Sequence, residues 1–299
     1  MQKITPHLWF DKEAREAAEF YTSLLPDSKV TNVTTITGTP SGDCDIVSFT
    51  LAGQSFMAIS AGPVFTFNPS ISFFICCETK EEVDALWAKL SDGGTVLMEI
   101  GAYPFSERYG WVQDRWGLSW QIMYMGGQAF QQKIIPALTF VGDVCGKVEE
   151  AMNFYTSVFS ARGGGDTKVN YVMKYGAGET PDKEGTIKHA GFVLAGMQFA
   201  AMDSAYEHKF AFNEAVSFIV HCDTQDEIDY FWGKLSAVPA SEQCGWLKDK
   251  YGISWQIVPT AMDEMMIKGT KDQIVRVTRA FLQMKKFDIA ELQKAYEQS

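Results

Sequence analysis

The sequence predicts an α+β protein made of two similar modules with curved mixed sheets, followed by a helical tail. Three observations lead to this fold class. The chain of 299 residues repeats its own motifs at a separation of domain length. Strand-like runs outnumber helical runs and are joined by hairpin signals, which favours mixed and antiparallel pairing. After Pro259 the strand pattern stops and helical spacing takes over.

The repeat is clearest in a Gly-Trp segment that occurs at residues 110–122 and again at 245–257. A separation of roughly 130 to 135 residues is far too long for a solenoid repeat and is the size of a domain. Three further pairs keep the same order: residues 20–23 with 154–157, 49–53 with 192–196, and 67–79 with 212–224. The sequence therefore predicts a first module at 1–125, a linker at 126–133, a second module at 134–260 and a tail at 261–299.

Each module is expected to open with a strand and an amphipathic helix. In the first module the strand covers residues 5–10, and apolar residues recur near helical spacing over 13–24. Three strand-like runs follow, and Ala52 and Gly53 interrupt the middle one, which predicts a tight hairpin. The runs cover residues 29–37, 45–59 and 70–77, and the second module opens with a strand at 134–141 and a helix at 148–159.

A second helix in each module is expected to begin at a capping box. Thr79 with Glu82, and Thr224 with Glu227, have the spacing at which a hydroxyl and a carboxylate satisfy free N–H groups of a first helical turn. The second helices run to about residues 90 and 235, and the modules close on strands at residues 120 and 255.

The tail is expected to hold two helices. Thr270-x-x-Gln273 caps one helix that runs to about residue 286, and Asp288-x-x-Glu291 caps another that runs to the end. The apolar stripe of the first helix is expected to dock on one of the modules. Recruitment of a partner protein by this tail is the alternative. The stripe consists of Ile274, Val277 and Phe281.

Composition narrows the classes of partner. The net charge of −11 argues against nucleic acid, because phosphate binding needs a basic surface. No apolar run approaches the ~20 residues that span a bilayer, and the first residues lack the apolar core of a secretory signal. The six cysteines form no C-x-x-C pair, which favours reduced thiols and a cytoplasmic protein. Either a monomer or a homodimer is compatible with the fused modules.

Three motifs carry a resemblance to a known family. They are the Gly-Trp-Val-x-Asp-x-x-Gly-x-Ser-Trp-Gln-Ile hairpin, the opening Ile-Thr-Pro-His-Leu-Trp-Phe at 4–10, and Ala-Glu-Phe-Tyr at 18–21. Together they resemble the PhnB-like, or 3-demethylubiquinone-9 3-methyltransferase-like, branch of the vicinal oxygen chelate superfamily. That superfamily also holds glyoxalase I, extradiol dioxygenases and the bleomycin and fosfomycin resistance proteins. The resemblance covers about residues 3–260 and implies two tandem glyoxalase-like βαβββ modules around a cavity.

The methyltransferase label does not fit the residues. A methyl-donor site typically needs a glycine-rich turn that leads from a strand into a helix. The one glycine cluster, at residues 163–165, follows a predicted helix and precedes a strand. We therefore do not expect methyl transfer.

The resemblance also implies where a divalent metal would lie. In the superfamily its ligands come from the first strand, the strand before the second helix, and the last strand. A first-row metal needs at least three imidazole, carboxylate or thiolate donors, which these positions do not supply. No cofactor is therefore expected, with a divalent metal as the alternative. The matching positions hold His7, Ser72 and Gln121 in the first module, and Ala137, Ser217 and Gln256 in the second.

The same positions are expected to line a ligand cavity. His7 and His221 have a structural alternative as satisfied histidines, and Gln121 and Gln256 as groups that satisfy polar atoms of the sheet. Asp114 and Asp249 are expected to accept backbone N–H bonds in hairpin turns. No catalytic residue is identified. The expected ligand-binding residues are His7, Trp9, Ser72, Gln121, Ser217, His221 and Gln256.

Two functions from different classes follow. The favoured one is a binding protein that sequesters or senses a small organic molecule in a sheet-enclosed cavity. The alternative is a divalent-metal-dependent lyase, isomerase or dioxygenase, which would need a third strong ligand near His7. A scaffold that uses the tail helices as an interface is a third hypothesis.

Overall fold

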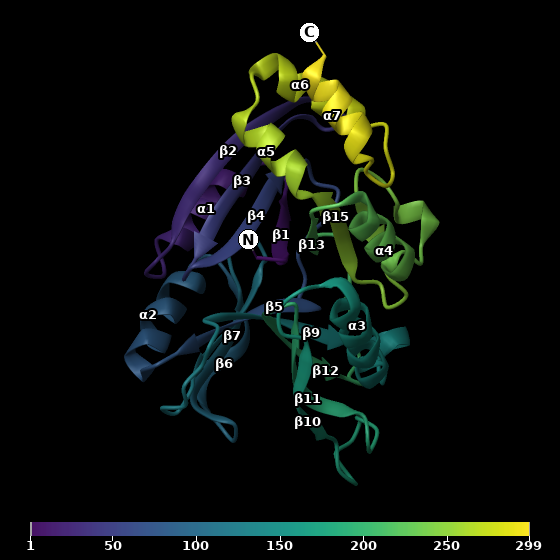
Figure 1. The fold of residues 1–299 in the computed structure, drawn as a ribbon. Helices are drawn as coiled ribbons and strands as arrows, with labels where there is room; N and C mark the ends of the chain where they lie inside the picture. The colour runs from purple at the N-terminus through teal and green to yellow at the C-terminus, as the bar shows by residue number, and fades with distance from the viewer. Residues whose placement is uncertain (1, 299) are drawn as a thin grey trace. The chain divides into compact units, whose positions relative to one another are not determined.

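The computed structural model of the chain describes residues 2–298 and divides into two compact units. Unit 1 joins the chain up to Phe65 with the chain from Asn213 onward, and unit 2 is Thr66–Phe212. Each unit therefore takes one part from each sequence repeat (Figure 1). No helix within residues 2–298 is long and apolar enough to cross a membrane.

Unit 1 is built on a seven-stranded mixed sheet. Its centre is the antiparallel pair β1 and β13, which joins the two repeats and places Thr5 opposite Ile219 and His7 opposite Ser217. β1 runs parallel to β4, and β13 runs parallel to β15. In sheet order the strands are β14 (Trp246–Lys248), β15 (Ser254–Pro259), β13 (Val216–Cys222), β1 (Ile4–Phe10), β4 (Gln54–Ser60), β3 (Gly42–Leu51) and β2 (Lys29–Thr39).

Unit 2 repeats this plan in an eight-stranded mixed sheet. β5 and β9 form the central antiparallel pair, with Ser72 opposite Ala137. β5 runs parallel to β8, and β9 runs parallel to β12. In sheet order the strands are β10 (Lys168–Lys174), β11 (Ile187–Leu194), β12 (Met197–Asp203), β9 (Ile134–Phe140), β5 (Ile71–Cys77), β8 (Ser119–Tyr124), β7 (Ser106–Gln113) and β6 (Thr95–Tyr103).

Helices cover the sheets through faces that the sequence patterning provides. In α1 (Ala14–Thr22) the buried side chains recur at helical spacing, as Ala14, Ala17, Ala18 and Tyr21. The other helices are α2 (Lys80–Leu90) and α3 (Val148–Arg162) in unit 2, and α4 (Gln225–Leu235), α5 (Thr260–Lys268), α6 (Lys271–Phe281) and α7 (Ile289–Glu297) in unit 1.

The predicted turns and caps are confirmed with one change. Ala52 and Gly53 have φ of 46° and 75°, and a hairpin joins β3 to β4 there. Thr79 accepts the N–H of Glu82 at 3.1 Å, as the capping box requires. The Glu82 carboxylate, however, accepts the N–H of Glu78, one residue before the cap, and also pairs with Lys133. The same shift occurs at Thr224, where Glu227 accepts from Asp223 and pairs with Lys3.

Two elements were not predicted. Residues 95–103 form β6, the outer strand of a hairpin with β7. Residues 260–268 form α5, which follows directly from the last strand. The first tail helix ends at Phe281, five residues before the predicted end.

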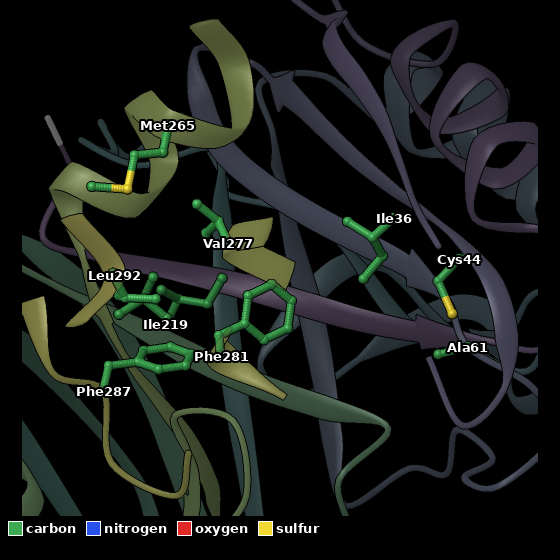
Figure 2. Packing of buried hydrophobic residues seen from close by; sticks show 10 residues of the cluster. Ile36, Cys44, Ala61, Ile219, Met265, Val277, Phe281, Phe287 and Leu292 are labelled. Atoms are coloured by element: carbon green, nitrogen blue, oxygen red, sulfur yellow. The ribbon is translucent and has the colours of Figure 1, made fainter. Parts of the chain in front are cut away.

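The tail helices α5, α6 and α7 pack onto one face of the seven-stranded sheet. We call it the His7 face, and it also carries Trp9, Ile219 and Val258. Ile219 and Val258 lie in one buried cluster with Val277 and other tail side chains. Figure 2 shows Ile219 of this cluster near Val277 and Phe281. The tail stripe docks on a sheet as expected, but not on a single module, because the cluster contains Ile36 of the first repeat and Ile219 of the second. Val277 and Phe281 are buried in the cluster, and Ile274 packs against it.

Candidate functional site

The His7 face brings together five of the predicted ligand-binding residues. His7 lies opposite Ser217, and Ile219 pairs with Gln256, so the register places these side chains on one side of the sheet. The Gln256 amide Nε2 donates to Ser217 Oγ at 3.0 Å. Ser217 and Gln256 are both buried.

His7 is buried without a complete set of hydrogen bonds. Its side chain is only 3% exposed, and among residues 2–298 its Nδ1 has no hydrogen-bond partner. The ring packs edge-on against Trp246 at 5.3 Å between centroids. Burial lowers the pKa of His7 to about 3, so the imidazole is neutral. The structure therefore does not support the alternative of a fully hydrogen-bonded strand histidine.

Trp9 and His221 form hydrogen bonds with other residues of the chain. The Trp9 indole N–H donates to the Gly62 carbonyl at 2.8 Å. His221 Nδ1 lies 3.0 Å from an Asp263 carboxylate oxygen of α5, and Nε2 lies 3.0 Å from Thr5 Oγ1. Both nitrogens of His221 thus have partners, so this residue ties the sheet to the tail.

The other two predicted residues lie on the eight-stranded sheet. Ser72 and Gln121 share a side of this sheet, which we call the Gln121 face, with Ala137 opposite Ser72. Gln121 Nε2 donates to Ser72 Oγ at 2.7 Å. The Tyr109 hydroxyl donates to Gln121 Oε1 at 2.6 Å. Gln121 is therefore fixed from both ends of its amide.

A small, partly open pocket with a cavity volume of about 10 Å³ lies on the Gln121 face. None of its nine lining residues is acidic or basic except His189, whose pKa is lowered by burial. His189 Nδ1 lies 2.9 Å from the Tyr171 hydroxyl, and its ring meets Phe74 edge-on. Apart from Gln121, Thr139 and His189 the lining is apolar. A neutral, mostly apolar pocket with a few polar groups suits a small organic molecule.

The structure corrects the grouping of the predicted metal positions. His7, Ser72 and Gln121 do not lie on one sheet, because β1 pairs with β13 of the other repeat instead of with β5. His7 is grouped with Ser217 and Gln256, and Ala137 with Ser72 and Gln121.

Neither group fits a divalent metal. The group of His7, Ser217 and Gln256 offers one imidazole, and its Gln256 amide is bonded to Ser217. The second imidazole of the His7 face, His221, is engaged at both nitrogens by Asp263 and Thr5. On the Gln121 face both ends of the amide are engaged, and an alanine stands at the imidazole position. Within residues 2–298 no group of three or more His, Cys, Asp or Glu side chains is placed to hold a metal ion. A first-row divalent ion needs at least three strong donors, which neither group supplies.

The sequence did not single out the pocket residues Phe74, His189 and Met202, nor Tyr109. Phe74 could have been found, because it follows Ser72 at period two on the same strand face. His189 and Met202 come from β11 and β12, so only the pairing of these strands reveals them. Tyr109 lies in the hairpin that the sequence did not predict.

His7 makes a testable contribution to pH dependence. A histidine in the unfolded chain titrates near ~6.5, whereas burial lowers the folded pKa of His7 to about 3. Between these values the unfolded chain binds a proton that the folded chain does not, so the free energy of unfolding falls as pH drops through 6.5. We expect His7→Ala to be less stable at pH 7 but to lose less stability between pH 7 and 5.5. The difference between wild type and His7→Ala in this loss of unfolding free energy approaches about 1.4 kcal/mol per pH unit.

Urea unfolding at the two pH values checks this expectation. His208→Ala is the comparison variant: burial lowers the pKa of His208 too, but this side chain is only partly buried, so its removal should change the pH dependence less than His7→Ala does. An identical pH dependence in wild type and His7→Ala would show that His7 is protonated or exposed in the folded protein.

Comparisons with known proteins bear on the family and the fold. The sequence model of the family described as 3-demethylubiquinone-9 3-methyltransferase matches residues 2–123 and 132–258. The PhnB protein from Bacillus cereus is 40% identical over 41% of this chain and 99% of its own, with a TM-score of 0.39. Glyoxalase I from Zea mays is 10% identical over 89% of this chain and 97% of its own; its TM-score of 0.53 shows a shared fold. No curated protein matches the chain.

Proposed function

The chain belongs to the 3-demethylubiquinone-9 3-methyltransferase family as two fused copies with the vicinal oxygen chelate fold, and from this premise we propose that it binds a small uncharged organic molecule on the Gln121 face. The observation that carries the proposal is the pocket around Gln121 and His189. Gln121 retains one amide N–H after its bond to Ser72, and His189 retains Nε2 after its contact with Tyr171. Both residues line the pocket together with Phe74.

The two faces differ in what covers them. Side chains of α5, α6 and α7 pack on the His7 face of unit 1, around Ile219 and Val258. On the Gln121 face Phe74, His189 and Met202 remain partly exposed around the pocket. Ser72 and Gln121 are therefore the predicted ligand-binding residues that we retain for the ligand. His7, Trp9, Ser217, His221 and Gln256 lie on the face that the tail occupies.

Binding without chemistry is favoured over the alternatives. A lyase, isomerase or dioxygenase of the superfamily type needs a metal, and neither donor set fits one. Methyl transfer lacks the glycine-rich turn that it needs, because Gly163 follows α3 and the next strand is β10. We place the protein in the cytoplasm, supported by six free thiols of which four are buried. Burial raises the pKa of Cys76 to about 11 and of Cys222 to about 12, so these thiols stay protonated.

The duplication supplies a matched pair of variants to test this proposal. A screen of uncharged aromatic fragments by ligand-observed NMR identifies binders of the wild type. We expect Gln121→Ala to weaken binding about 10-fold, as the loss of one hydrogen bond of about 1.4 kcal/mol requires. Gln256→Ala removes the equivalent amide on the covered face and should leave binding unchanged. Hits that lose affinity only in Gln256→Ala would move the site to the other sheet, and an absence of hits would refute the proposal.

A further inference from the structure

The β6–β7 hairpin is present in only one of the two repeats. Twenty residues, 91–110, separate α2 from Trp111, whereas ten residues, 236–245, separate α4 from the equivalent Trp246. The extra residues form β6 and the turn that leads into β7. Since the rest of the two modules corresponds strand for strand, unit 1 serves as an internal comparison for what this hairpin adds to unit 2.

The hairpin contributes Tyr109, and the equivalent residue in unit 1 is Cys244. Tyr109 precedes the Gly-Trp pair by one position, as Cys244 does in the second repeat. The Tyr109 hydroxyl donates to Gln121 Oε1 at 2.6 Å. Cys244 does not replace this bond, since its thiol accepts from Gln243 and its N–H donates to the Met284 carbonyl of the tail. The amide oxygen of Gln121 thus has a donor that the duplicated site lacks.

The Tyr109 hydroxyl is held in place. Its ring is buried and meets Phe105 edge-on at 4.9 Å and Tyr103 edge-on at 5.5 Å. Burial raises the pKa of Tyr109, so the phenol keeps its proton at any ordinary pH and acts as a donor. A buried phenol O–H needs an acceptor, and the amide oxygen of Gln121 supplies it. If the amide were reversed, the Tyr109 O–H would lose this acceptor.

This bond decides what Gln121 can offer to the pocket. An amide has one oxygen acceptor and two N–H donors. Tyr109 engages the oxygen, and Ser72 accepts one N–H. The second N–H is the amide group left for a ligand.

We propose that Tyr109 is a specificity-determining positioning residue that holds the Gln121 amide with its N–H toward the pocket, so that the site selects uncharged aromatic molecules with a hydrogen-bond acceptor. A carbonyl oxygen or an unprotonated ring nitrogen meets this requirement. A flat molecule whose only polar group is an N–H would meet the Gln121 N–H, which is also a donor, and would form no hydrogen bond there. This inference rests on the proposed function, because it names the ligand chemistry of the same pocket.

Quinoline and indole test the inference, as flat bicyclic probes that carry respectively an acceptor nitrogen and a donor N–H. Dissociation constants for both come from ligand-observed NMR titrations of the full-length protein. We expect wild type to bind quinoline about 10-fold more tightly than indole. This ratio corresponds to one hydrogen bond of about 1.4 kcal/mol. Tyr109→Phe keeps the ring and removes the donor, so the ratio should fall to about threefold or less. Tyr103→Phe, a hydroxyl deletion in the same hairpin, should keep the wild-type ratio.

Gln121→Met provides a second variant that removes the amide at nearly constant length, and it should also abolish the preference. A structural role for Tyr109 would lower the melting temperature and weaken both probes equally, without changing their ratio. A ratio that is unchanged in both Tyr109→Phe and Gln121→Met, or a wild type that binds the two probes equally, would overturn the inference alone. Failure of wild type to bind either probe would overturn the proposed function as well.

Discussion

Replacement of Asp249 by alanine is expected to destabilise unit 1 by about 3–5 kcal/mol, because three buried donors lose their acceptor together. Asp249 is 1% exposed. One carboxylate oxygen accepts the N–H groups of Tyr251 at 2.8 Å and Ile253 at 3.1 Å, and the other accepts the Trp255 indole N–H at 2.8 Å. The side chain therefore closes the last hairpin and fixes a buried tryptophan of the core.

Unit 2 contains the same arrangement at Asp114. Its oxygens accept from Trp116 and Leu118 and from the Trp120 indole, at 2.9, 3.1 and 2.8 Å. Asp114→Ala should therefore destabilise unit 2 by a similar amount. Urea unfolding monitored by tryptophan fluorescence measures both losses, and Asp43→Ala, at an exposed position, should change stability by no more than about 0.5 kcal/mol. A loss below about 1 kcal/mol in both buried variants would mean that these hydrogen bonds contribute little to stability.

Truncation of Phe281 is expected to release the tail from the His7 face. Phe281 is 6% exposed, lies in the buried cluster with Ile219 and Val258, and meets Phe287 edge-on. Removal of a buried phenylalanine side chain costs about 3–5 kcal/mol. This loss weakens the docking of the tail, because the Phe281 ring on α6 packs against the sheet (Figure 2). Amide hydrogen exchange over residues 260–297 should rise strongly in Phe281→Ala.

A chemical probe reports on the sheet face against which the tail packs. Diethyl pyrocarbonate modifies neutral imidazoles, and the wild type should protect His7, which is 3% exposed. In Phe281→Ala the modification of His7 should increase together with tail exchange. Val275→Ala lies on the same helix at a position that is 36% exposed, and it should change neither readout. Unchanged exchange in Phe281→Ala would show that the tail is held mainly by its other contacts, such as Lys286 with Asp229.

The secondary structure of the modules could be predicted because the two repeats carry the same local patterns. The Ala52-Gly53 hairpin, the threonine caps and the turn aspartates depend on residues within a few positions of each other. Asp114 was expected to accept backbone N–H groups, and it does so. Its third bond, to the Trp120 indole, arises only when the last strand returns beside the turn.

The sequence pattern could not predict that each compact unit combines one half of the first repeat with one half of the second. β5 and β13 are both short, buried and apolar, and each follows the spacing that a partner of β1 requires. Nothing local distinguishes the two pairings, so His7 was grouped with Ser72 when its partner is Ser217. The same difficulty hid the pocket. Ser72 and Gln121 were identified from their strands, but His189 reaches them only through the order of β5, β9, β12 and β11.

The central claim is that ligand binds beside Gln121 and not beside Gln256. The most direct measurement follows the side-chain NH₂ resonances of both glutamines in ¹⁵N-labelled protein while quinoline is added. We expect the Gln121 signals to shift and saturate while the Gln256 signals stay in place, because the tail packs on the face on which Gln256 lies. Saturable shifts of Gln256 with Gln121 unmoved would instead place the binding site on the seven-stranded sheet.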